Sequence, residues 1–312
     1  MRSKALNRFE ERLRSIREKL ISIDVQTLGD HVGMLVLETL KKIKAKDRES
    51  LSSSLRMMSS TIREYVPFSF SALLIGDILD ITASKLDQNS LDPSEALESA
   101  EAALKRLLTY STSSLKKLAI NLARHIDTES KVLVLGYTNA LFKILSLTSS
   151  KIETIYTLSF WPLMSGRGFA VELRSRGLNA IPWPDSAVSQ AVSESDYVII
   201  STVGVSAEGV FIAESGSYGA TLLASNEGKD VIVLTRAWNF RSSTPDNIGE
   251  ITSEIPHPLK KNILMKIKVF DIIPLAKART IVTDLNVLPI DNIDSHTIND
   301  YYTKILDNIL LI

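Results

Sequence analysis

The sequence predicts an α/β protein in which a helical N-terminal domain precedes a doubly wound, mostly parallel (Rossmann-like) α/β domain. The prediction rests on a change in the spacing of apolar residues near residue 127, and on the Gly and Pro residues that cluster beyond it. Before this point apolar residues recur at three- and four-residue spacing, as on one face of a helix. Beyond it they form short uninterrupted runs, as in strands covered on both faces. We therefore predict a helical domain over 1–127 and an α/β domain over 128–312.

About five helices are predicted for the first half. Two carry clear apolar stripes, which comprise Leu6, Phe9, Leu13, Ile16 and Leu20 in the first and Val32, Leu35, Val36, Leu40 and Ile43 in the second. Another helix begins at Asp92-Pro93-Ser94-Glu95, because Asp can cap it, Pro suits its first turn and Glu favours the positive end of its dipole. It meets no further Gly or Pro and can therefore extend to His125.

The second half alternates between short apolar runs and helical segments. The runs predicted as buried strands are Val132 to Leu135, Thr154 to Leu158, Ala180 to Ile181, Tyr197 to Ile200, Val231 to Leu234 and Thr280 to Val282. Because these runs lack polar alternation, we expect a parallel sheet with crossover helices on both faces. Gly and Pro cluster at the turns that such units require.

The composition is typical of a globular protein and excludes several kinds of chemistry. The 312 residues include 36 basic and 36 acidic side chains, so net charge provides no long-range attraction to nucleic acid or to an acidic membrane. The absence of cysteine excludes disulfides, thiolate zinc sites and a cysteine nucleophile. No apolar run reaches the ~20 residues that cross a bilayer, and the N-terminus lacks the apolar core of a signal peptide. We therefore expect a soluble, cytoplasmic protein without membrane association.

Common cofactor and metal signatures are missing from the sequence. Gly136 ends the first predicted strand, but Tyr137-Thr138-Asn139-Ala140 follows where a dinucleotide site needs further glycines. No Gly-Lys-Ser/Thr sequence is present to form a P-loop. The histidines have no metal-ligand spacing; they are His31, His125, His257 and His296. We therefore predict no cofactor, no metal ion and no nucleotide hydrolysis.

Two polar segments are candidate binding positions. Asp185 follows Trp183-Pro184 at the carboxyl end of a strand, where it either caps the next helix or takes part in ligand binding. The glycine-rich segment Gly209 to Gly219 is either an ordinary turn or an anion cradle made by backbone N–H groups at a helix start. Glu214 within this segment would repel a phosphate, so any such cradle is weakened.

Four motifs between residues 131 and 289 occur in a characteristic order. They are Asp185-Ser186-Ala187-Val188, Ser195 to Ala224, Phe270-Asp271-Ile272-Ile273-Pro274, and Thr283 to Pro289. In this order they resemble the segments "DSAV", "ADLVIVGADGV…NG…NKIGT", "FDVTPP" and "TELGVLTP". These segments belong to a superfamily that joins the alpha, beta and delta regulatory subunits of translation initiation factor 2B with two sugar-phosphate isomerases. The isomerases act on methylthioribose-1-phosphate and ribose-1,5-bisphosphate.

The resemblance implies that the isomerase chemistry is lost. The isomerases move protons with a cysteine and an aspartate, whose positions hold Thr138 and Val203 here. Valine cannot transfer a proton, and a threonine hydroxyl is far too weak an acid to replace a thiol. Three cationic positions of the family also differ, where Glu214, Trp161 and Val66 stand. We therefore predict no catalytic residue and a vestigial ligand pocket made of Gly136, Thr138, Asn139, Asp185, Val203, Glu214, Gly216, Ser217 and Asp271.

By this resemblance we expect a catalytically inactive regulatory subunit that acts through protein contacts in translation initiation. The implied partners are related subunits, a second copy of the chain and the translation initiation factor 2 complex, with weak binding of a phosphorylated small molecule as a further option. The apolar residues of Ile305 to Ile312 either form a dimer interface or pack inside the monomer. One alternative is a sugar-phosphate enzyme or sensor that uses Thr138, Asn139, Asp271 and the Gly216-Ser217 backbone. Another is a structural partner of an active isomerase.

Overall fold

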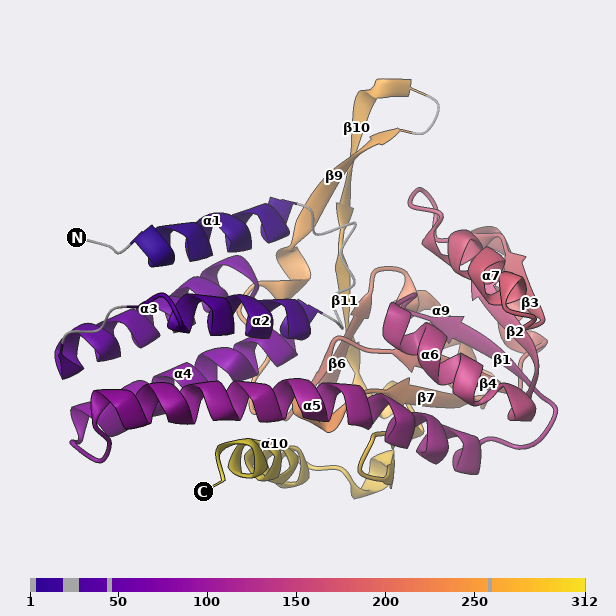
Figure 1. Cartoon of the computed structure of the whole chain (residues 1–312). Coiled ribbons are helices and arrows are strands. Elements are labelled where there is room, and N and C mark those ends of the chain that lie inside the picture. Colours follow the sequence, from indigo (N-terminus) through magenta and orange to yellow (C-terminus); the bar gives the residue numbers. More distant parts are fainter. Residues whose placement is uncertain (1–3, 19–27, 44–46, 258–259, 312) are drawn as a thin grey trace. The chain divides into compact units, whose positions relative to one another are not determined.

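The computed structural model divides the chain into two compact units (Figure 1). One unit comprises Met1–Ser113 with Tyr301–Ile312, and the other comprises Ser114–Asp300. The structure describes residues 4–18, 28–43, 47–257 and 260–311. The helical first half and the mostly parallel α/β second half confirm the predicted fold class. The domain boundary near residue 127 stays a prediction.

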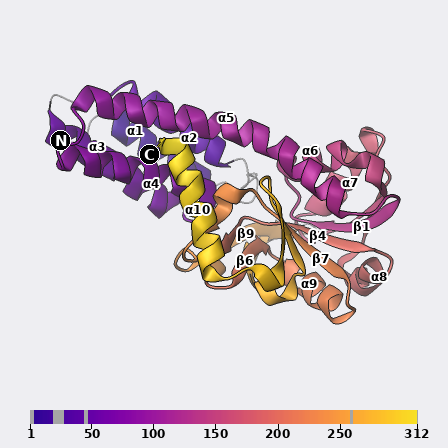
Figure 2. The ribbon, with the colours of Figure 1, turned by 90° about the horizontal axis from the view of Figure 1, so that it is seen from below.

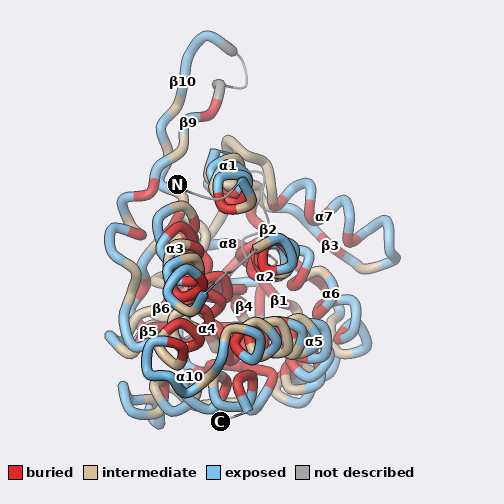
Figure 3. The backbone as a smooth tube through the Cα atoms, turned by 60° about the vertical axis from the view of Figure 1, so that its left-hand side comes forward, coloured by how far each residue is buried: buried red, intermediate tan, exposed pale blue. Residues whose placement is uncertain are grey.

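The first unit is built from helices with apolar inner faces. Its helices are α1 (Lys4–Glu18), α2 (Leu28–Leu40), α3 (Arg48–Tyr65), α4 (Phe70–Asp87) and the first part of α5 (Pro93–His125). The stripes predicted for α1 and α2 are buried at Leu6, Phe9, Leu13, Val32, Leu35, Val36 and Leu40, and Leu20 lies outside the described residues. Figure 3 shows the buried residues of α3 and α4 in red.

Helix α5 begins and ends where the sequence predicts. The Asp92 carboxylate accepts a hydrogen bond from the Glu95 N–H at 2.8 Å, and the Glu95 carboxylate accepts one from the Asp92 N–H at 2.9 Å. This reciprocal pair satisfies backbone donors that a helix start otherwise leaves unpaired.

The C-terminal residues pack inside the monomer. Helix α10 (Ser295–Leu310) buries Ile305, Ile309 and Leu310, and the Arg106 side chain donates a hydrogen bond to the Ile309 carbonyl at 2.5 Å. Of the apolar residues expected at a dimer interface, Leu311 is exposed and Ile312 lies outside the described residues. These residues therefore give little support to a homodimer.

The second unit contains the main sheet. Among the described residues this sheet has seven strands in the order β13-β12-β7-β4-β1-β2-β3. Their bounds are β1 Ser130–Leu135, β2 Ile152–Leu158, β3 Ala180–Trp183, β4 Tyr197–Ser201, β7 Asp230–Leu234, β12 Thr280–Val282 and β13 Val287–Pro289. All neighbours are parallel except β12 and β13. The six predicted strands are confirmed, and the antiparallel edge strand β13 was not predicted.

Helices cover both faces of this sheet. They are α6 (Asn139–Leu147), α7 (Ser165–Ser175), α8 (Val188–Ser193) and α9 (Ser217–Asn226). Figure 2 shows α6 and α7 on one face and α8 and α9 on the other. The chain leaves β1 toward β2 and β3 on one side, and toward β4 and β7 on the other. Open α/β sheets bind ligands at such a switch point, beyond the carboxyl ends of the strands.

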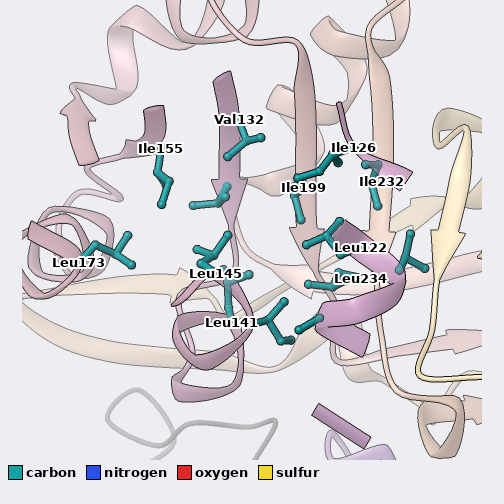
Figure 4. Close-up of a cluster of buried hydrophobic side chains, with 14 of the residues drawn as sticks. Leu122, Ile126, Val132, Leu141, Leu145, Ile155, Leu173, Ile199, Ile232 and Leu234 are labelled. Atoms are coloured by element: carbon teal, nitrogen blue, oxygen red, sulfur yellow. The ribbon is translucent and has the colours of Figure 1, made fainter. Parts of the chain in front are cut away.

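A buried apolar cluster joins one face of the sheet to α6, α7 and the end of α5 (Figure 4). Leu122 of α5 and Ile126, directly after this helix, pack with Val132 of β1, Ile199 of β4 and Ile232 of β7. Leu141 and Leu145 of α6 and Leu173 of α7 belong to the same cluster. These side chains hold the strand ends in the register on which the candidate site depends.

Among the described residues, two smaller sheets complete this unit, and the sequence did not predict them. One has the order β11-β6-β5-β8, with β5 Gly204–Ser206, β6 Val210–Glu214, β8 Phe240–Arg241 and β11 Phe270–Pro274. The other pairs β9 (Thr252–His257) with β10 (Lys260–Lys268). The segment Gly209 to Gly219 was predicted as a glycine-rich turn or cradle, but its first part is strand β6, which pairs with β5 and β11. This pairing is between distant segments, which local sequence patterns do not reveal.

In the described part of the chain, none of the helices combines the length and the apolar character that crossing a bilayer requires.

Candidate functional site

Most predicted site residues of the second unit follow strand ends, whereas Glu214 is the last residue of strand β6 and Asp271 lies within strand β11. Gly136 follows β1 with a φ of +80°, and a Cβ atom there would lie 2.4 Å from the carbonyl oxygen of Ser201, at the end of β4. Only glycine accepts both the positive φ and the close approach without strain. Gly136 therefore brings the ends of β1 and β4 together at the switch point of the sheet.

Thr138 and Asn139 begin helix α6. Thr138 is the N-cap, and its hydroxyl accepts a hydrogen bond from the Leu141 N–H at 3.1 Å. Ser and Thr are preferred at this position because their oxygen satisfies a free backbone donor. Asn139 is the first residue of the helix and is exposed. The hydroxyl at the position of the isomerase cysteine thus has a structural role.

Val203 provides only apolar surface at the end of β4. Its side chain is 9% exposed, and its backbone N–H donates to the carbonyl of Ile212 on β6 at 2.8 Å. The neighbouring Thr202 hydroxyl is buried and bonded to the backbone of Gly204 and Ile212. At this position the backbone joins two sheets, and the side chain offers no group that could exchange a proton.

The loop after β2 is held by Tyr137 and Asp185. The Tyr137 hydroxyl donates to the Leu158 carbonyl at 3.0 Å and accepts from the Leu158 N–H at 2.8 Å. The Asp185 carboxylate accepts from the N–H groups of Phe160 and Trp161, both at 2.7 Å. The helix cap considered for Asp185 is not formed, because this carboxylate is bonded across to the β2 loop instead.

Glu214 ends β6 and faces this same loop. Its carboxylate accepts from the Tyr137 N–H at 3.4 Å and from the Ser165 hydroxyl at 3.5 Å. Burial raises the pKa of Glu214 from its ordinary 4.5 to about 7, and the two hydrogen bonds oppose that rise. Burial also raises the pKa of the Tyr137 hydroxyl well above its ordinary value, and nearby Glu214 adds to the rise. The carboxyl of Glu214 is therefore partly protonated near neutral pH.

The N-terminus of α9 already holds a carboxylate. Asp271 of β11 accepts hydrogen bonds from the N–H groups of Gly216 at 2.8 Å and Tyr218 at 2.9 Å. These N–H groups belong to the segment that the sequence predicted as a possible anion cradle. Helix N-termini favour negatively charged partners of this kind. Between them, Ser217 is fully buried and its hydroxyl has no hydrogen-bond partner in the described residues.

These contacts bring most of the predicted site residues into one region. The ring of Phe160 lies 3.5 Å from where a Cβ atom of Gly216 would be, which joins the β2 loop to the start of α9. Tyr137, Phe160 and Ser165 were not predicted, although an aromatic residue directly after the Gly136 turn was a detectable signal. Val66 belongs to the other compact unit, where it is fully buried.

The region contains carboxylates and hydroxyls, and Glu214 and Trp161 stand at two positions where the family resemblance implies cations. Asp185 and Asp271 are each bonded to two backbone N–H groups, and Glu214 is bonded to one N–H and one hydroxyl. Within the ranges that the structure describes, no three His, Asp or Glu side chains come together to hold a metal ion. The chemistry available is hydrogen bonding and, at Glu214, proton exchange.

Replacing Asp271 by Ala is expected to lower the free energy of unfolding by about 1 to 2 kcal/mol, because two N–H groups at the start of α9 lose their acceptor. Urea denaturation measures the change. The matched control is Asp291→Ala, which removes an exposed carboxylate with no side-chain partner in the described residues and should stay within ~0.5 kcal/mol of the parent. Equal stability of the two variants would contradict the capping role.

Comparisons with known proteins agree with the fold and the motifs. The family model described as the initiation factor 2 subunit family matches residues 30–289. The beta subunit of translation initiation factor eIF2B from Dictyostelium discoideum is 25% identical over 154 residues, which is 48% of this chain and 40% of that protein. The chain thus spans well under two thirds of the length of this relative.

Solved structures share the fold at low sequence identity. The crystal structure of the translation initiation factor eIF-2B of Pyrococcus horikoshii matches with a TM-score of 0.73 and 16% identity, covering 91% of this chain and 99% of that chain. A chain of the tetrameric eIF2B-beta2-delta2 complex from C. thermophilum matches with a TM-score of 0.70 and 15% identity, covering 96% and 95%. Because the family model covers most of the sequence, the chain belongs to the initiation factor 2 subunit family.

Proposed function

We propose that this protein is a non-catalytic subunit of the initiation factor 2B type, which acts in translation initiation through contacts with other proteins. Membership of the initiation factor 2 subunit family supports the link to translation. The related Dictyostelium protein is named as a subunit, and the C. thermophilum structure is named as a complex of beta and delta chains. Assembly with related chains, or with a second copy, in the cytoplasm follows from this proposal.

The observation that carries the proposal is which side chains and hydrogen bonds occupy the carboxyl edge of the main sheet. Thr138 caps a helix and Val203 is an apolar side chain, so the two positions that transfer protons in the isomerases have no group for that task. The helix start that would bind a phosphate is bonded to Asp271 of the same chain. A phosphorylated sugar would have to displace this carboxylate, whose negative charge repels the phosphate. The positions of Glu214 and Trp161 hold no cation that could offset this repulsion.

We expect no isomerisation of ribose-1,5-bisphosphate or methylthioribose-1-phosphate above a heat-treated control. We also expect either compound to leave the melting temperature unchanged at millimolar concentration, since a ligand at about 100 times its Kd would add ~2.7 kcal/mol of stability. Turnover that an altered Thr138 abolishes would contradict the proposal. The proposed assembly with other proteins is tested by co-purification with related subunits of the same organism, whose mass and stoichiometry are then measured.

A second function has one observation in its favour. The Glu214 carboxyl has a pKa of about 7, which suits a group that gives and takes protons near neutral pH. An enzyme or sensor of a small phosphorylated molecule could use this group with Thr138, Asn139 and the backbone of Gly216 and Ser217. A ligand-induced rise in melting temperature that Glu214→Gln removes would favour this alternative over the non-catalytic subunit.

A further inference from the structure

The β9–β10 hairpin is a separate part of the second unit. Its strands form a two-stranded antiparallel sheet of their own, with Lys266 opposite Glu254 and Lys268 opposite Thr252. In Figure 1 the hairpin extends away from the main sheet of the same unit. A hairpin without further strands is at most marginally stable in water, and its outer edges leave backbone donors and acceptors unpaired. Strand β10 has nine residues and an unpaired outer edge, and such an edge favours binding of an external partner.

The described part of β10 exposes apolar side chains. Ile263 is 46% and Leu264 is 59% exposed, and Figure 3 shows most of this strand as exposed. Ile263 and Leu264 are neighbours on the strand and therefore lie on opposite faces of the ribbon, so each face exposes one apolar side chain that a partner can bury. Because side chains alternate along a strand, Leu264 shares one face with Lys266 and Lys268.

The charge of the hairpin is strongly uneven. Strand β10 contains Lys260, Lys261, Lys266 and Lys268, whereas β9 contains one acidic residue, Glu254, in a chain whose formal net charge is zero. Lys266 and Lys268 are exposed, and no carboxylate of the described residues forms an ion pair with either of them. Lys266 and Lys268 outnumber Glu254 on this face, so its net charge is positive. A positive face beside an exposed leucine is complementary to a surface that is acidic and partly apolar.

We propose that the exposed face of β10 with Leu264, Lys266 and Lys268 is a docking surface for an acidic protein segment that also carries apolar side chains. The sequence from Thr252 to Lys268 contains no Phe, Tyr or Trp, so it lacks the stacking side chains that single-stranded nucleic-acid sites use. A second copy of the same hairpin would bring like charges together, which disfavours it as the occupant. This inference does not depend on the proposed function, because it concerns a surface apart from the sheet edge.

The test uses the full chain and a fluorescent peptide of alternating Glu and Val residues, with binding followed by anisotropy at low salt. We expect the parent to bind and Lys266→Gln with Lys268→Gln to bind roughly tenfold more weakly. Glutamine is chosen because a glutamate at 266 would place like charges opposite Glu254. The matched control is Lys116→Gln with Lys117→Gln, two exposed lysines on α5, which should bind as the parent does.

Two further measurements separate the alternatives. Leu264→Ser should also weaken peptide binding, because the proposal places an apolar side chain of the peptide against Leu264. Unchanged binding would show that charge alone holds the peptide and would overturn the apolar part of the proposal. Poly(U) RNA that binds more tightly than the peptide and depends on the same lysines would overturn the proposal in favour of nucleic acid. Failure of the parent to bind, or an equal loss in both double variants, would overturn it as well. Circular dichroism and the melting temperature confirm that each variant is folded.

Discussion

Replacing Gly166 by Ala is expected to destabilise the protein by about 3 kcal/mol or more, or to prevent folding. Gly166 lies in the first turn of α7, and a Cβ atom there would be 1.7 Å from the Leu158 carbonyl oxygen and 2.7 Å from the Tyr137 ring. The oxygen belongs to the end of β2 and is itself held by the Tyr137 hydroxyl. Neither neighbour is the end of a flexible side chain, so the whole start of α7 would have to move.

The same helix provides a matched control. Gly168 is two residues further on, is exposed, and has no atom within 4 Å of the position that a Cβ would take. Because Ala favours a helix over Gly, Gly168→Ala should raise the free energy of unfolding by roughly 0.5 to 1 kcal/mol. Urea denaturation of the two variants gives both values. Similar effects of the two substitutions would contradict the close packing of α7 on β2.

The second large effect is a loss of stability with rising pH that depends on Glu214. Well below pH 4.5 this carboxyl is protonated in both the folded and the unfolded chain, so ionisation of Glu214 costs no stability there. Between pH 4.5 and about 7 the unfolded chain releases the proton while the folded chain keeps it, so folding becomes progressively less favourable. At about 1.4 kcal/mol per pH unit, the full difference approaches ~3 kcal/mol above pH 7.

Glu214→Gln should remove this pH dependence, because the amide keeps the size of the side chain and never ionises. We therefore expect the variant to gain stability relative to the parent as the pH rises from 4.5 to 8, measured by urea denaturation at each pH. Glu172→Gln, at an exposed position of α7, is the control and should follow the parent throughout. A constant difference between the parent and Glu214→Gln over this range would show that the carboxyl titrates normally.

The sequence predicted the main elements well because their signals are local. A run such as Val132 to Leu135 with no polar alternation identifies a buried parallel strand, and β1 contains it. The capping pair of Asp92 and Glu95 lies within four residues, so the start of α5 was visible without any tertiary information. Strands β6 and β11 were missed because they pair with each other across more than 50 positions of the sequence, so no local pattern shows their backbone partners.

The candidate site shows a similar division. Family motifs alone located Thr138, Val203, Glu214 and Asp271, and predicted that the isomerase groups were absent. They did not predict that Asp271 would be bonded to the start of α9, or that Asp185 would hold the β2 loop. Each of these contacts joins residues more than 20 positions apart, so no local pattern contains it.

The sequence by itself determined the fold class and the family, because these depend on residue identity and spacing, and it predicted the loss of the isomerase groups. The tertiary structure decided what the remaining polar groups do, because hydrogen-bond partners and burial depend on distant segments. Glu214 is an example: on the sequence it was a fixed negative charge, and in the fold burial raises its pKa to about 7. Whether a carboxyl is charged depends on the solvent and the donors around it, which only the folded chain defines.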